Sequence, residues 1–254
     1  LPESKSLVVH FGLKNDGCEA IAARLEGRRF AIPLGTSVAK TNCPETISPE
    51  GGIADYEKAF GAMAAIGDYT TVNISCPNAF GGQPFTDPGL LDRLLERLAM
   101  VPTRKPVFIK LSPDLDDAQT DAVVDVAVRR GVRGFICANL TKDRLSAAIS
   151  DNDPVPPVGG MSGKVVVSLA DAQITRVYGR TRGKAVIIGC GGVFTAEDAY
   201  RKIRLGASLV QMITGMIYEG PQVVGEINRG LVRLLERDGF ANISEARGAD
   251  AGWQ

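Results

Sequence analysis

Short apolar runs rich in β-branched residues recur along this chain, and they predict six buried β-strands. Several runs are almost continuously apolar, which is typical of a parallel sheet that is covered on both faces. Most of them end near Gly, Pro or Asn, which indicates that each strand leads into a loop. The predicted strands span residues 29–38, 69–74, 106–111, 134–138, 185–188 and 207–212.

Amphipathic segments lie between these strands and predict helices. Leucines spaced three and four residues apart in 90–98 form one apolar stripe, and Asp87-Pro88 ahead of them is typical of a helix start. Further helices are predicted at 116–130, 195–203 and 223–235, and after Gly163. Strands that alternate with helices imply βαβ units, and therefore a parallel α/β sheet.

The strand count leaves two architectures open. A closed (β/α)8 barrel needs eight strands, and only six are predicted. The chain therefore forms either a doubly wound open sheet or a barrel without two early strands, which residues 1–11 do not supply. Residues 142–160 form the longest predicted loop, which is either a cover for an active site or a simple connection.

Composition narrows the class of protein. The 254 residues suit one large α/β domain, and a hydrophobic content of 44% allows a sizeable core. Lys plus Arg and Asp plus Glu both number 29, and this balance gives no general case for nucleic-acid or anionic-membrane binding. No apolar run approaches the length of a membrane span.

The cysteines and the single histidine argue against disulfides, a metal site and a histidine-based catalytic triad. The five cysteines are odd in number and include no C-x-x-C, so we expect neither a disulfide framework nor a metal site. A reducing cytoplasm is the expected compartment. His10 is the single histidine, so a histidine-based triad would have to use it, and we expect a structural role for it instead.

The most informative polar residues follow the strand at 69–74. Cys76 stands there between two carboxamides, Asn73 and Asn78. Barrel enzymes keep their reacting groups at the carboxyl ends of parallel strands, where a thiol can act as a base and amides can orient a substrate. The structural alternative is a small buried cysteine with asparagines that cap a turn.

Two later strands also carry polar residues at their ends. Lys110 lies in an apolar strand, and a buried lysine is costly unless an anion or hydrogen bonds satisfy it. Its structural alternative is an internal salt bridge. Asn139 follows the next strand, at the corresponding place.

Glycine-rich turns near the end of the chain suggest a phosphate site. They lie at residues 159–163, at Gly191-Gly192 and at Thr214-Gly215, and two of them precede helices. Such turns after late barrel strands commonly hold a cofactor phosphate through backbone N–H groups. No G-x-G-x-x-G follows a first strand and no P-loop motif occurs, which disfavours a Rossmann nicotinamide site and a P-loop ATPase.

Together these motifs resemble the dihydroorotate dehydrogenase family. The similarity lies in Asn73-Ile74-Ser75-Cys76-Pro77-Asn78, Lys110-Leu111-Ser112-Pro113-Asp114, Gly159-Gly160-Met161-Ser162-Gly163-Lys164 and Gly189-Cys190-Gly191-Gly192-Val193, and in residues 202–211, within a resemblance that runs from about Gly12 to Phe240. The resemblance implies an FMN-dependent (β/α)8 barrel that oxidises dihydroorotate to orotate in pyrimidine synthesis. The C-terminal segments of this chain are most similar to those of the quinone-linked, class 2 enzymes.

The resemblance also implies roles for individual residues. Cys76 matches the base that removes a proton from C5 of dihydroorotate, and Lys110 matches the lysine that stabilises the reduced flavin. The implied flavin contacts are Ser37, Asn73, Lys110, Ser162, Gly163, Gly191, Gly192, Ile213 and Thr214. The implied substrate contacts are Lys14, Asn73, Asn78 and Asn139.

Five positions depart from the family pattern. Class 2 enzymes usually have serine where Cys76 stands, and cysteine is typical of class 1, so the electron acceptor is a separate question. Quinone is favoured over fumarate or NAD. Lys14 and Leu140 replace polar substrate contacts, Ser37 replaces a flavin-contacting asparagine, and Ile213 replaces a tyrosine near the flavin phosphate.

The resemblance further implies one FMN-binding domain over residues 1–254 that lacks the family's first strand and its N-terminal helical pair. Contact with the cytoplasmic membrane would run through that absent part, and a homo-oligomer is left open. Two other functions remain: a different FMN oxidoreductase acting on a cyclic amide of the dihydropyrimidine or dihydrouridine type, and a non-catalytic remnant that binds a small anion.

Overall fold

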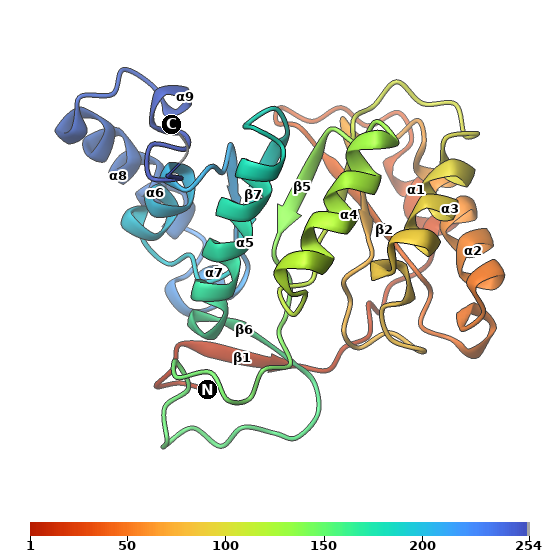
Figure 1. The fold of residues 1–254 in the computed structure, drawn as a ribbon, viewed down its shortest axis with the longest axis horizontal. Helices are drawn as coiled ribbons and strands as arrows, with labels where there is room; N and C mark the ends of the chain where they lie inside the picture. The colour runs from red at the N-terminus through yellow and green to blue at the C-terminus, as the bar shows by residue number, and fades with distance from the viewer. Residues whose placement is uncertain (253–254) are drawn as a thin grey trace.

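A computed structural model describes residues 1–252, and its centre is a curled sheet of six parallel strands (Figure 1). The spatial order of the strands is β2-β3-β4-β5-β7-β8, so neighbours in the sheet follow each other along the chain. The strands are β2 (Gly35–Ala39), β3 (Tyr69–Asn73), β4 (Val107–Lys110), β5 (Gly134–Cys137), β7 (Val186–Cys190) and β8 (Leu209–Gln211). All six predicted strands are therefore confirmed.

Helices cover one face of this sheet. The helices are α1 (Cys18–Leu25), α2 (Pro49–Met63), α3 (Pro88–Leu98), α4 (Asp117–Arg129), α5 (Val167–Arg180), α6 (Ala196–Arg204), α7 (Thr214–Glu219), α8 (Val223–Asp238) and α9 (Ile243–Ala246). The main core lies between the sheet and α2 to α5, and it includes Val72, Ile109 and Phe135, which are fully buried. Side chains alternate along a strand, so the residues next to each of these three in their strands point to the opposite face, which the helices leave uncovered.

Helix α3 illustrates how the sequence sets these elements. Asp87 caps the helix by accepting a hydrogen bond from the Leu90 N–H, and Pro88 occupies the first turn. Leu91 and Leu94 are fully buried on the apolar stripe. Each contributes about 1.5–3 kcal/mol through the apolar surface it removes from water.

The first predicted strand is shorter than its apolar run suggests. Residues 29–34 are mostly exposed and not extended into the sheet, and β2 begins at Gly35. The Leu34 N–H donates to the Asp68 side chain instead of pairing with a strand. An irregular segment with a bend at residues 31–32 therefore replaces the first half of the predicted strand.

A separate two-stranded antiparallel sheet was not predicted. β1 (Ser6–Val9) pairs antiparallel with β6 (Gly160–Gly163), at the end of the sheet toward which β5 points (Figure 1). The segment treated as a glycine turn, 159–163, is thus mainly a strand that ends at Gly163. Residues 1–11 contribute only the short strand β1, outside the parallel sheet, which agrees with the expectation that they do not complete the barrel.

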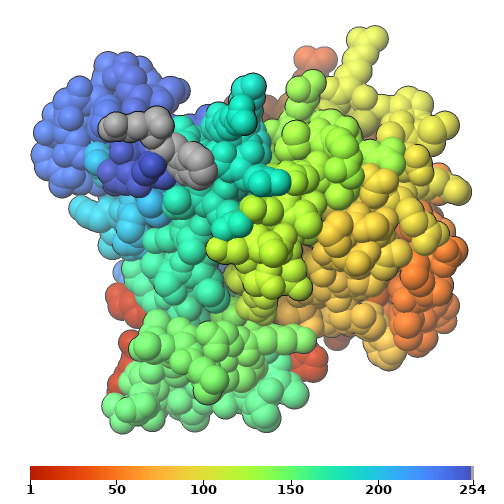
Figure 2. Space-filling model, viewed as in Figure 1, coloured from red at the N-terminus to blue at the C-terminus, as the bar shows by residue number. Residues whose placement is uncertain are grey.

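The long loop 142–159 packs beside this two-stranded sheet. Asp153 accepts hydrogen bonds from the backbone and side chain of Ser4, which tie the loop to the start of the chain. Figure 2 shows the loop, in green, as a lobe projecting from one edge of the molecule. Leu145 at its surface is 94% exposed.

Within residues 1–252 the parallel sheet is open, with β2 and β8 at its edges. Six strands thus form most of a barrel, as predicted. Among the same residues, no helix combines the length and the apolar character needed to cross a membrane.

Candidate active site

The polar residues singled out in the sequence meet at one end of the sheet. All six strands run in parallel, so their carboxyl ends share one rim. Cys76 follows the end of β3, Lys110 is the last residue of β4, Asn139 follows β5, and Gly192 follows β7. The prediction that these four residues share one rim is confirmed.

Strand register also places several of these residues on one face. Lys110 is the partner of Asn73 across β3 and β4, and Ser37 lies two residues before the partner of Asn73 on β2. Phe108, Ile136 and Ile188 form a small buried cluster on this same face, which the helices leave uncovered. The rim therefore combines an apolar floor with amide and ammonium groups.

The Cys76 thiol is half-buried and free. Burial raises its pKa above the ordinary value, because an apolar environment disfavours the thiolate. A hydrogen bond from the Asn78 backbone and the positive charges of Lys110, Lys142 and Lys40 oppose this rise in pKa. The thiol is thus protonated at neutral pH, with cations nearby to support its anion.

The amides around Cys76 are held by a connected set of hydrogen bonds. Asn73 accepts from the Ser75 N–H at 3.2 Å and from the Ser75 hydroxyl at 2.9 Å. Asn139 donates to the Ser75 carbonyl and hydroxyl oxygens at 3.0 and 2.9 Å. Asn78 donates to the Val9 carbonyl at 2.8 Å, which links the loop after β3 to β1. These contacts fix the loop that carries Cys76.

Lys110 does not form the internal salt bridge that was its structural alternative. Within residues 1–252, no carboxylate lies within ion-pair distance of its ammonium group. It is half-buried and lines a cavity of about 70 Å³ together with Asn139 and Cys190. Its positive charge is available to an anionic group in that cavity.

Lys40 is a site residue that the sequence analysis missed. It is buried at the end of β2, and it donates to the Phe80 carbonyl and, at 3.3 Å, to the Thr46 hydroxyl. Burial lowers its pKa. The signal that could have found it is similar to the one used for Lys110, a lysine at the carboxyl end of an apolar strand.

The glycine turns also come together. The Gly163 carbonyl oxygen lies 3.3 Å from the position that a Cβ atom on Gly192 would take. The Thr214 hydroxyl is 2.9 Å from the Ser162 hydroxyl, and Gly215 packs against the Val193 carbonyl. The three turns therefore line one cavity, as the sequence predicts.

This cavity suits a phosphate group. Gly191 and Gly192 have φ of 110° and 71°, and a Cβ atom at either residue would collide with Val166 or Val167. Only glycine therefore leaves the backbone of this turn in place and open to a ligand. A cavity of about 70 Å³ holds a group the size of phosphate.

The departures from the family pattern lie around this site. Leu140 and Ile213 line the same cavity as the turns, and Ile213 is 58% exposed. Ser37 is exposed on β2. Lys14 is exposed too, in a segment whose neighbour Leu13 lies beside Cys76. His10, expected to be structural, is exposed at the end of β1.

Comparison with known proteins decides the family. Residues 2–235 match the family model described as dihydroorotate dehydrogenase. The chain belongs to the dihydroorotate dehydrogenase family. It is 42% identical to dihydroorotate dehydrogenase (quinone) of Anaeromyxobacter dehalogenans, over 98% of this chain and 69% of that protein. It is 40% identical to the protein of the same name from Myxococcus xanthus, over 98% of this chain and 68% of the relative.

Solved structures of the family have the same fold. DHODH from Eimeria tenella in complex with ferulenol matches with a TM-score of 0.87 and 26% identity, over 98% of this chain and 72% of that one. The ligand-free enzyme from the same organism gives a TM-score of 0.88, at 26% identity over 98% of this chain and 75% of the other. The predicted TIM-barrel class is confirmed.

Proposed function

We propose that this protein oxidises dihydroorotate to orotate in pyrimidine biosynthesis and passes the electrons to a quinone. Membership of the family and the names of relatives that cover nearly the whole chain support this activity. The single observation that carries the site assignment is the meeting of Cys76, Lys110, three asparagines and the glycine turns at one rim.

The cofactor we propose is FMN, held in one domain. Gly163, Gly191-Gly192 and Thr214 would hold its phosphate, because their backbone turns line a phosphate-sized cavity. Ser37, Asn73, Ser162 and Ile213 would contact the rest of the flavin. When bound, FMN supplies the acceptor for the hydride that leaves C6 of dihydroorotate.

The residues of this chain would do the remaining chemistry. The Cys76 thiolate would take the proton from C5 as the C5–C6 double bond forms. Asn73, Asn78 and Asn139 would hold the substrate ring without adding charge, and Lys14 would lie near the same pocket. Lys110 would place positive charge where negative charge accumulates during the reaction.

Anaerobic stopped-flow measurement of flavin absorbance tests the proposal. Dihydroorotate is expected to bleach the flavin of the wild-type protein, and Cys76→Ala is expected to slow this bleaching by at least about 10²-fold, the usual share of a general base, with FMN still bound. Cys76→Ser is expected to retain part of the rate only at higher pH, because a hydroxyl is harder to deprotonate than a thiol.

One control variant and three possible outcomes make this experiment decisive. Cys18→Ala removes a thiol on α1 that packs against the main core, and should leave the rate unchanged. Bleaching by dihydrouracil but not by dihydroorotate would favour the other cyclic-amide oxidoreductase. Extracted cofactor that contains adenine would refute FMN, and a wild-type rate in Cys76→Ala would refute the base.

A further inference from the structure

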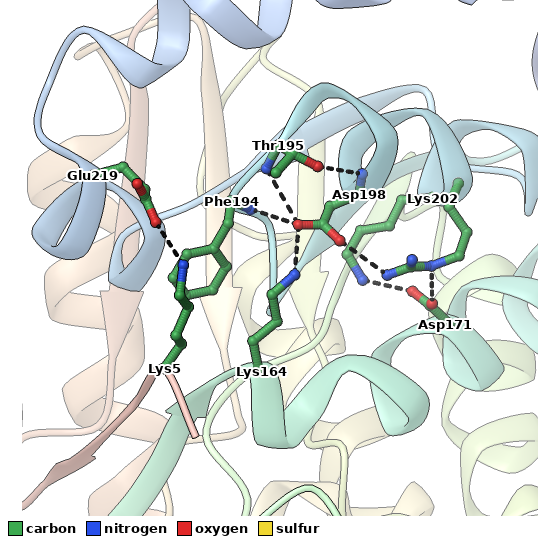
Figure 3. Close-up of polar contacts among 9 residues, drawn as sticks. Lys5, Lys164, Asp171, Phe194, Thr195, Asp198, Lys202 and Glu219 are labelled. Atoms are coloured by element: carbon green, nitrogen blue, oxygen red, sulfur yellow. Dashed lines mark hydrogen bonds and ion pairs between the residues drawn. The ribbon is translucent and has the colours of Figure 1, made fainter. Parts of the chain in front are cut away.

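A buried carboxylate beside the glycine turns collects an unusual number of donors. Asp198 is 6% exposed in the first turn of α6. One of its oxygens accepts from the Phe194 N–H at 3.0 Å, from the Thr195 N–H at 3.2 Å and from the Lys164 ammonium at 2.6 Å (Figure 3). The carboxylate thereby holds the backbone directly after the Gly191-Gly192 turn.

Lys164 reaches this carboxylate from a different turn. It follows Gly163 directly, and its side chain is 33% exposed. Figure 3 shows the ammonium group turned toward Asp198, and it lies 4.9 Å from the centre of the Phe194 ring. A lysine beside a phosphate turn could contact the phosphate itself, but here its charge is directed to a carboxylate.

The ion pair therefore joins two of the three turns. Gly163 and Gly192 are in contact, and Lys164 and Asp198 each lie a few residues from one of them. Arg201 also holds Asp198 in place. Its guanidinium group lies 3.5 Å from the Asp198 carboxylate and forms an ion pair with Asp171 on α5 at 2.7 Å. The ion pair thus ties together two turns that follow different strands, β6 and β7.

We infer that Lys164 and Asp198 are positioning residues that clamp the Gly163 and Gly191-Gly192 turns into one phosphate-binding cradle. This inference rests on the proposed function, since it takes the cradle as the site of the FMN phosphate. Neither side chain needs to contact the flavin. The clamp sets the spacing of backbone N–H groups, so its loss weakens binding of the phosphate and spares binding of the flavin ring.

The two-ligand comparison between FMN and riboflavin, which lacks the phosphate, tests the clamp. Fluorescence titration of the apoprotein gives the Kd for each flavin. Lys164→Met is expected to weaken FMN binding about tenfold, in line with the coupling of close charge pairs, and to change riboflavin binding by less than about twofold. Lys164→Arg keeps the charge and is expected to restore most of the preference for FMN.

Two further variants complete the test. Asp198→Asn should also weaken FMN binding, and the double variant with Lys164→Met should lose little more than the single ones, because both changes break one tie. Arg93→Met breaks an exposed ion pair with Glu50, between α2 and α3, and should leave both affinities unchanged. Thermal unfolding of each apoprotein separates lost stability from lost phosphate binding.

The outcomes distinguish the clamp from the function it rests on. Equal FMN-to-riboflavin preference in wild type and Lys164→Met overturns the clamp and leaves the proposed function intact. Tighter FMN binding in Asp198→Asn overturns it as well, because Lys164 would then serve the phosphate directly. A wild-type protein that binds riboflavin as tightly as FMN overturns the phosphate site, and the clamp with it.

Discussion

At the scale of single residues, the Cys76 thiol is balanced between two opposing effects. Burial raises its pKa, while Lys110, Lys142 and Lys40 lower it. The net direction is upward, so the free protein holds a thiol rather than a thiolate at neutral pH. The thiolate that acts as the base therefore forms only when a higher pH or a bound ligand favours the anion.

The rate of Cys76 alkylation by iodoacetamide tests this balance, because the thiolate is the reacting species. We expect the rate to rise with pH with a midpoint above that of an ordinary cysteine. Lys110→Met should move the midpoint to still higher pH, because it removes the positive charge that lowers the pKa of Cys76 most. Mass spectrometry of the Cys76 peptide separates this site from the other four thiols.

A matched lysine variant controls for general charge. Lys58→Met removes an exposed lysine on α2 that pairs with Glu19, and the Cys76 midpoint should not move. A midpoint below that of free cysteine in the wild type would contradict the dominance of burial.

At the scale of elements, helix caps show how short sequence signals set structure. Asp116 accepts from the Gln119 N–H at 2.8 Å, and the Gln119 side chain accepts from the Asp116 N–H at 3.0 Å. This capping box begins α4 and satisfies two donors that would otherwise lack partners. α4 packs against α3 and α5, so a helix that begins at the right residue helps to keep the helical layer over the sheet in place.

Asp116→Ala should therefore lower the free energy of unfolding by about 1 kcal/mol, the typical cost of a lost N-cap. Urea unfolding followed by circular dichroism measures it. Glu236→Ala changes an exposed position inside α8 and should shift stability by less than about 0.5 kcal/mol. Equal effects of the two substitutions would mean that the capping box adds nothing.

At the scale of the whole molecule, the sheet concentrates burial at its centre. Val72, Ile109 and Phe135 on β3, β4 and β5 are fully buried, while β2 and β8 lie at the edges in the part of the chain described. Long loops with exposed backbone open at much lower cost than central strands. The molecule should therefore have a graded pattern of local stability across the sheet.

Hydrogen–deuterium exchange measures this gradient. Amides of β3, β4 and β5 should exchange slowest, those of β2 and β8 faster, and those of loop 142–159 fastest apart from the chain ends. Adding FMN should slow exchange at the turns around Gly163 and Gly192 more than in β3. Protection of β8 equal to that of β4 would contradict an open edge.

The sequence by itself determined the strands, most helices and the membership of the rim. Hydrophobic period and caps are local signals, so α3, α4, α6 and α8 follow from spacing alone. Parallel strands share one carboxyl end, so residues at strand ends had to meet once the strands were known. Helix α2 was missed because its first turn carries Gly51-Gly52, which weaken a helical pattern.

Only the tertiary structure decided which distant groups touch. The pairing of β1 with β6 joins residues more than about 150 positions apart, and no local pattern encodes such pairing. The pairing of Lys164 with Asp198 and the burial of Lys40 also depend on how separate turns pack. The pKa, the partner and the accessibility of a side chain are set by its neighbours in space. Those neighbours come from distant parts of the chain, so only the tertiary structure shows which they are.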